Sequence, residues 1–131
     1  MKFLQPPNWA RPKGYANGIA AKGNTVFVSG MVGWNEQGEF TAMDFTGQVR
    51  QALLNIVEVL QQAGARPEHI ARMTWYVVDK GEYLNSAKEI GAAYREIIGR
   101  HYPAMTVVEV SGLIEEHARV EIEATAVVPG E

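Results

Sequence analysis

Apolar residues recur at helical spacing in two stretches of this chain. In residues 44–63 they return every three or four positions and form one stripe. Asp44 suits the N-cap position of this segment, and Gly64 and Pro67 are typical of a helix end. A second stripe predicts a helix over about 82–98, with an inner face formed by Tyr83, Ala87, Ile90, Tyr94, Ile97 and Ile98.

Other stretches are rich in β-branched and aromatic residues, or alternate between apolar and polar side chains. They predict strands at 17–21, 25–32, 70–78, 106–110 and 119–128. Because Lys22, Gly23 and Asn24 supply turn chemistry, we expect the first two strands to pair as a hairpin. In the last strand Val120, Ile122, Ala124 and Ala126 face one way, and Arg119, Glu121, Glu123 and Thr125 face the other.

The predicted order of elements is β-β-α-β-α-β-β. This order favours an α+β fold, in which two helices cover one face of a single mixed sheet. The chain has 131 residues, and domains of about 100–150 residues are the commonest. No repeat, linker or low-complexity stretch interrupts it, so we expect one domain over 1–131.

The second face of the predicted sheet carries apolar residues as well. Trp75, Val77 and Val107 fall at alternate positions opposite the expected core set, and such a face usually pairs with a partner or with a copy of itself. The alternative is a bulge that shifts the alternation by one residue. Glu121 and Glu123 would share this face, where an unpaired ionised carboxylate is costly. They would therefore lie near a rim or line a polar cleft between subunits.

Composition narrows the function classes. The chain has no cysteine, and its three histidines are far apart, so we expect no metal site and no cofactor. The net charge is −3 without a basic cluster, so we expect no nucleic-acid partner. Apolar runs are too short for a membrane span or a secretory leader. A cytoplasmic location is the resulting expectation.

The chain also carries a series of short segments, in order, over nearly its whole length. They are Tyr15 with Gly18-Ile19, Val26-Phe27-Val28-Ser29-Gly30, Gln48-x-x-Gln51-Ala52-Leu53-x-Asn55-Ile56, Ala63-Gly64-Ala65, Thr74 to Asp79 with Tyr83 and Tyr94, Pro103-Ala104, Glu109-Val110, and Val120-Glu121-Ile122-Glu123-Ala124. In these segments the chain resembles the YjgF/RidA family, whose members are also known as endoribonuclease L-PSP-like proteins. The resemblance implies a chorismate-mutase-like fold and a homotrimer with ligand clefts between subunits. For the best-known branch it implies hydrolysis of enamines and imines, such as 2-aminoacrylate, to 2-oxo acids and ammonia.

One position departs from that branch, whose motif is Pro-Ala-Arg with the arginine on the substrate carboxylate. Here the segment reads Pro103-Ala104-Met105, and a thioether offers neither the charge nor the fixed donors of a guanidinium. Losing one partner of a desolvated charge pair costs about 2–5 kcal/mol. At ~1.4 kcal/mol per factor of ten, carboxylate affinity would fall roughly thirty- to several-thousandfold. We therefore expect a different substrate preference.

The resemblance assigns Glu121 as the catalytic residue, near the water that attacks the imine carbon; the alternative is a structural carboxylate at an interface. The candidate substrate-binding residues are Tyr15, Ser29, Gly30, Trp34, Tyr83, Met105 and Val107. For these positions the competing interpretations are a residue that only packs, a bulge without a ligand, or an exposed surface residue. Arg11, Lys13 or Arg119 could replace the missing cation, although a solvated surface charge is commoner.

Three functions remain open at this point. The first is an imine or enamine hydrolase with an unusual substrate. The second is a trimeric small-molecule-binding protein without turnover, in which Met105 marks lost catalysis. The third, a ribonuclease or translation inhibitor, is disfavoured because the chain is not basic and lacks a pattern of stacking and basic residues.

Overall fold

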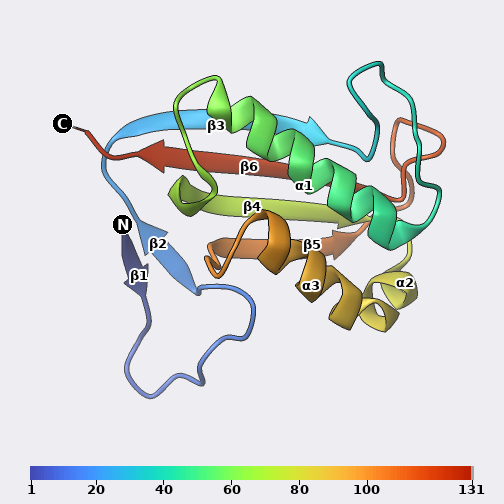
Figure 1. Cartoon of the computed structure of the whole chain (residues 1–131). Helices are drawn as coiled ribbons and strands as arrows, with labels where there is room; N and C mark the ends of the chain where they lie inside the picture. Colours follow the sequence, from blue (N-terminus) through green and yellow to red (C-terminus); the bar gives the residue numbers. More distant parts are fainter. Residues whose placement is uncertain (131) are drawn as a thin grey trace.

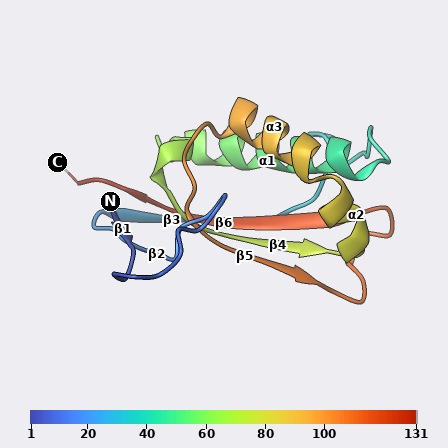
Figure 2. The same cartoon turned by 90° about the horizontal axis from the view of Figure 1, so that it is seen from below.

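The computed structural model describes residues 1–130. Its centre is a four-stranded mixed sheet, with the two long helices on one face (Figures 1 and 2). In spatial order the strands are β3 (Asn24–Met31), β6 (Val120–Val128), β4 (Ile70–Val77) and β5 (Ala104–Glu109). β4 and β5 are parallel, whereas β6 runs antiparallel to both of its neighbours. The expected α+β class and the mixed sheet are confirmed.

Two long helices lie side by side on the sheet, α1 (Phe45–Gln61) and α3 (Ala87–Ile97). The α1 helix begins where the sequence predicts, because the Asp44 carboxylate accepts a hydrogen bond from the Gly47 amide at 3.1 Å. Its apolar stripe forms the centre of the core, with Val49, Leu53 and Ile56 fully buried. Among residues 1–130, no helix has the length and hydrophobicity needed to cross a membrane.

The sequence predicts one helix over about 82–98, but the structure has two helices in this region. Helix α2 (Lys80–Asn85) ends at Ser86, and α3 starts directly after it. Asp79 caps α2 by accepting from the Glu82 amide at 3.1 Å, so the helix begins earlier than the apolar stripe indicates. Ser86 leaves helical geometry, with φ −105° and ψ 13°. The chain bends there, and α3 then buries Ile90, Ala93 and Tyr94.

The pairing of the N-terminal strands differs from the expected hairpin. Strand β2 (Gly18–Ala20) pairs with β1 (Lys2–Leu4), a strand that the sequence analysis missed, and the two form a separate small sheet. β3 pairs with β6 instead. The physical reason is burial: Val26 and Val28 on β3 pack into the core, and the long alternating strand β6 offers the matching register.

The assignment of Trp75, Val77 and Val107 to the second face of the sheet is wrong. Trp75 and Val77 are only 2% and 1% exposed and belong to the core under the helices, and Val107 packs against that core. A register shift between Ile70 and Arg72, where β4 meets β6, moves the alternation by one residue. The alternation in β6 is as predicted, with Val120, Ile122, Ala124 and Ala126 buried.

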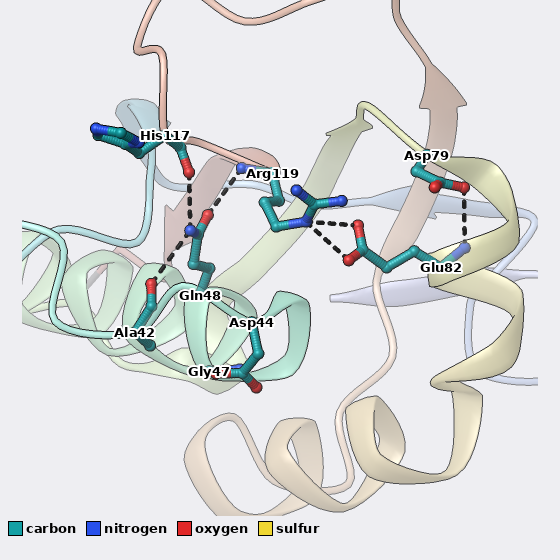
Figure 3. Close-up of polar contacts among 8 residues, drawn as sticks. All are labelled: Ala42, Asp44, Gly47, Gln48, Asp79, Glu82, His117 and Arg119. Atoms are coloured by element: carbon teal, nitrogen blue, oxygen red, sulfur yellow. Dashed lines mark hydrogen bonds and ion pairs between the residues drawn. The ribbon is translucent and has the colours of Figure 1, made fainter.

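A buried amide joins the helical layer to the loop before β6. Gln48, fully buried on α1, donates to the carbonyl oxygens of Ala42 and His117 at 3.2 and 2.9 Å (Figure 3). Its own carbonyl oxygen accepts from the Arg119 amide at 2.8 Å. Arg119 also contacts α2, because its Nε donates to both carboxylate oxygens of Glu82 at 2.7 and 2.9 Å.

Candidate functional site

A cavity of about 430 Å³ lies between α3 and the β4–β5 edge of the sheet. Its walls are mainly aromatic and aliphatic, and they are formed by Tyr15, Trp75, Tyr83, Tyr94, Tyr102, Ile90, Met105 and Val107. We call it the aromatic cavity. Its volume is within the range of small-molecule sites, about 300–1,000 Å³.

The fold brings the walls of the aromatic cavity together from distant parts of the chain. The Ala16 amide donates to the Pro103 carbonyl oxygen at 2.9 Å, which holds the neighbouring Tyr15 beside the start of β5. Met105 and Val107 come from β5, and their side chains face the helical layer because side chains alternate along a strand.

Two tyrosines of α3 and the following loop are rigidly placed. The Tyr94 hydroxyl donates to the His101 carbonyl oxygen at 2.6 Å. Its ring stacks on that of Tyr102, with centroids 5.5 Å apart and the planes within 14°. Burial, followed by the charge of the nearby Tyr102, raises the pKa of Tyr94 far above its usual range. Tyr94 therefore presents a neutral aromatic surface to the cavity.

Trp75 contributes the most deeply buried aromatic ring of this wall. It meets the edge of Tyr83 in a T-shaped arrangement, with ring centroids 6.3 Å apart, and burial raises the pKa of the Tyr83 hydroxyl. Among residues 1–130, the indole Nε1 of Trp75 has no hydrogen-bond acceptor. An unpartnered buried donor costs about 1–3 kcal/mol.

The charged side chains that line the aromatic cavity are all positive. Lys13 and Arg95 are among its lining residues, and no aspartate or glutamate is. A Cβ built on Gly91 would lie 3.2 Å from Arg95 Nη1, so the guanidinium folds back over α3. Within the described chain, neither cation forms an ion pair.

The other two cations considered from the sequence lie elsewhere. Arg119 is bound to Glu82, and this hydrogen bond raises the pKa of its guanidinium. Arg11 lines a second, smaller hollow together with Arg100 and His101, between the N-terminal sheet and the loop before β5. Of the candidate replacements, Lys13 is therefore the one that lines the same cavity as Met105.

Glu121 lies on the opposite, helix-free face of the sheet. It is half-buried next to Gly30, where the backbone of β3 approaches so closely that an added Cβ would collide with the carboxylate. Beside it, the Tyr76 hydroxyl donates to Glu123 at 2.6 Å. This hydrogen bond, more than burial or charge, raises the pKa of Tyr76. The pair Glu121 and Glu123 is thus half-buried on the free face, beside an open hollow that Ser29 and Glu123 line.

The candidate residues therefore divide between two faces of one chain. Tyr15, Tyr83, Met105 and Val107 line the aromatic cavity, and Ser29, Gly30 and Glu121 lie on the helix-free face. Trp34 lies at neither place, since it packs against Phe40 with ring centroids 6.0 Å apart.

Sequence reasoning missed several residues of the aromatic cavity, among them Trp75, Tyr94, Tyr102 and Arg95. The alternation along the chain puts Trp75 on the wrong face. Tyr94 is predicted only in the inner face of the second helix, and Arg95 is not among the predicted site residues. The helical spacing of Ile90, Gly91, Tyr94 and Arg95 could have found Tyr94 and Arg95, because these positions share one side of α3.

Within a single chain, the aromatic cavity can bind an apolar molecule that carries negative charge. It cannot supply a carboxylate base, because none lines it. The described residues also contain no group of three or more histidine, cysteine, aspartate or glutamate side chains that could hold a metal ion.

The sequence model of the family described as endoribonuclease L-PSP matches residues 9–128. The chain is 31% identical over 116 residues to the 2-iminobutanoate/2-iminopropanoate deaminase of Escherichia coli K12, covering 86% of each. It is 34% identical over 121 residues to a RutC family protein of Pyrococcus horikoshii, covering 91% of each.

Solved structures agree with these sequence relatives. A Rid family protein of unknown function from Yersinia pestis, YyfB, superimposes with a TM-score of 0.83 at 31% identity, over 97% of this chain and 98% of that one. Escherichia coli TdcF with bound serine matches with a TM-score of 0.69 at 30% identity, over 98% of this chain and 100% of that one. The chain belongs to the endoribonuclease L-PSP family, which includes the YjgF and Rid proteins.

Proposed function

We propose that this protein is a hydrolase of small imines or enamines, and that it works as a homotrimer with its sites between subunits. The observation that carries the proposal is the division of the candidate residues between two faces. The aromatic cavity has no base, while Glu121 is held against Gly30 on the helix-free face. A second copy packed on that face would bring a carboxylate to the mouth of the cavity.

The comparisons support the reaction class. A relative covering most of this chain is a 2-iminobutanoate/2-iminopropanoate deaminase, and a structural relative holds serine. In the proposed reaction, water adds to the imine carbon and Glu121 of the adjacent copy takes one of its protons. The carbinolamine then collapses, the C–N bond breaks, and ammonia leaves with a returned proton. The product is the corresponding oxo compound.

In this proposal Met105 changes the substrate preference. It stands where the resemblance predicts the carboxylate-binding arginine, and it presents a flexible apolar side chain to the cavity. Tyr15, Tyr83 and Val107 would contact the substrate body, and the backbone at Ser29 and Gly30 of the other copy would close the site. We expect weak activity on 2-aminoacrylate and better activity on bulkier imines.

The test is ammonia release from freshly generated 2-aminoacrylate and from a bulky imine. Glu121→Gln should lower turnover by about 10²–10⁴-fold, the usual effect of losing a general base, while binding of a product analogue survives. Glu58→Gln, an exposed position on α1, is the matched control and should retain activity. Met105→Arg should gain activity on 2-aminoacrylate. Full activity in Glu121→Gln would refute the role of this carboxylate.

Assembly requires a separate measurement. Phe27 is 79% exposed on the helix-free face, and we expect Phe27→Asp to convert the trimer to smaller species in light scattering coupled to gel filtration. Leu54→Asp, which places the same charge at an exposed position on α1, should leave the mass unchanged. A wild-type protein that is monomeric at micromolar concentration would contradict the intersubunit site.

A second function, binding without turnover, is favoured by one observation, the absence of a guanidinium on β5 at Met105. It predicts saturable ligand binding with no ammonia release above the solvent background. A ribonuclease activity is not favoured by the net charge of −3.

A further inference from the structure

The aromatic cavity has a chemical character that the proposed function alone does not specify. Five of its lining residues are aromatic, namely Tyr15, Trp75, Tyr83, Tyr94 and Tyr102, and Met105 adds a long apolar side chain. Trp75 and Tyr94 are 2% and 5% exposed and belong to the core, so core packing fixes the position of these two walls. They do not collapse onto the cavity, because each is held by its own neighbours.

The volume indicates a ligand larger than a three-carbon acid. The cavity is open to solvent and has a volume of about 430 Å³, within the range of sites for small molecules larger than a three-carbon acid. Gly91 lines the cavity without a side chain, and a Cβ there would lie 3.2 Å from Arg95 Nη1. A flat aromatic body would also stack favourably on tyrosine and tryptophan rings.

The cations lie in the same cavity as these rings. Lys13 belongs to the N-terminal segment and Arg95 to α3, so the two positive charges reach the cavity from elements other than β5. Both side chains are exposed and free of carboxylate partners within residues 1–130. An anionic group of a ligand would meet no opposing carboxylate among the lining residues.

We infer that Lys13 and Arg95 hold the anionic end of an aromatic carboxylate, whose ring occupies the aromatic cavity. This inference rests on the proposed function, because it names the substrate class of the same site: the imine or enamine of an aromatic 2-oxo acid. The exposed cations provide a weaker and more salt-dependent anchor than a buried guanidinium. The rings therefore contribute the larger share of the affinity.

The experiment measures binding of an unreactive probe, 3-phenylpropionate, to the full chain by titration calorimetry. Its amide, 3-phenylpropionamide, has the same ring without the charge, and propionate has the charge without the ring. We expect 3-phenylpropionate to bind tightest, with both comparison compounds at least about fivefold weaker, as expected for the loss of two exposed ion pairs or of the ring contacts.

Substitutions of the two cations test whether each contacts the carboxylate of the probe. Lys13→Gln and Arg95→Gln should each weaken 3-phenylpropionate binding by roughly two- to fivefold, and the double variant by roughly tenfold or more. The affinity for 3-phenylpropionamide should not change. Lys88→Gln is the matched control, because it removes an exposed cation from α3 that does not line the cavity.

The outcomes separate this inference from the proposed function. If 3-phenylpropionate does not bind, or binds equally well to the double variant, the inference is overturned even if ammonia release from imines is robust. If binding follows the charges as described but no imine is hydrolysed, the ligand class stands and the hydrolase proposal fails. Binding of propionate as tight as that of 3-phenylpropionate would also overturn the inference, since the ring would then contribute nothing.

Discussion

The buried amide of Gln48 offers the sharpest test of how the fold is held together. Its side chain is 0% exposed and makes three hydrogen bonds, all to backbone groups: the carbonyls of Ala42 and His117 and the amide of Arg119. Gln48→Leu keeps a similar volume but removes all three bonds. The backbone groups left behind lie at Ala42, in the segment before α1, and at His117 and Arg119, in the loop that leads into β6 (Figure 3).

The expected loss in the free energy of unfolding follows from the three backbone groups that lose a hydrogen bond. A buried polar group left unsatisfied costs about 1–3 kcal/mol, and water can reach part of this loop, so we take roughly 1–1.5 kcal/mol for each of the three groups. The better transfer of a leucine side chain offsets about 1 kcal/mol. We therefore expect Gln48→Leu to lose about 2–4 kcal/mol of the free energy of unfolding, out of a total of about 5–15 kcal/mol.

The assay is urea denaturation followed by circular dichroism, at one fixed protein concentration because assembly would contribute to stability. The midpoint should fall while the slope of the transition stays unchanged. The control is Gln61→Leu, the same substitution at an exposed position near the end of α1, which should change stability by less than about 0.5 kcal/mol. A loss below about 1 kcal/mol for Gln48→Leu would refute the assigned role of this amide.

Two further predictions concern the helix-free face. Gly30→Ala should displace the Glu121 carboxylate, because the added Cβ would occupy its position, and we expect imine turnover to fall at least tenfold. Gly112→Ala, where an added Cβ meets no atom within 4 Å, should leave turnover unchanged, and equal activity in both variants would contradict the reasoning. The second prediction concerns pH: the hydrogen bond to Glu123 raises the pKa of Tyr76 above 10.0, so its stabilisation is complete below the unfolded pKa and is lost as pH rises through the folded one. In difference spectra at alkaline pH, Glu123→Gln should bring one tyrosine ionisation to lower pH, and an unchanged titration would exclude this hydrogen bond as the cause.

The sequence predicts well those elements whose structure depends on residues close to one another along the chain. The three- and four-residue spacing of Val49, Leu53 and Ile56 indicates α1, and the cap at Asp44 lies within the same local stretch. The alternation along β6 is equally local, and Val120 and Ile122 are buried as it indicates. The α+β class follows from these patterns, since two apolar stripes and one set of strands leave few arrangements.

Pairing between distant segments could not be predicted in the same way. A turn at Gly23 is compatible with a hairpin, but the register of β3 is set by β6, about one hundred residues further along the chain. The shift between Ile70 and Arg72 is a geometric irregularity that leaves no mark in composition, and it reverses the face of Trp75.

The candidate site shows the same division between local and tertiary information. The residues themselves supplied Tyr15, Met105 and Glu121 through their resemblance to a family, because such motifs are short and local. Only the tertiary structure separates Glu121 from Met105 on two faces of the sheet and brings Lys13 and Arg95 to one cavity. The physical reason is that a cavity and its charge depend on which elements pack together, and packing joins residues whose separation along the chain carries no periodic signal.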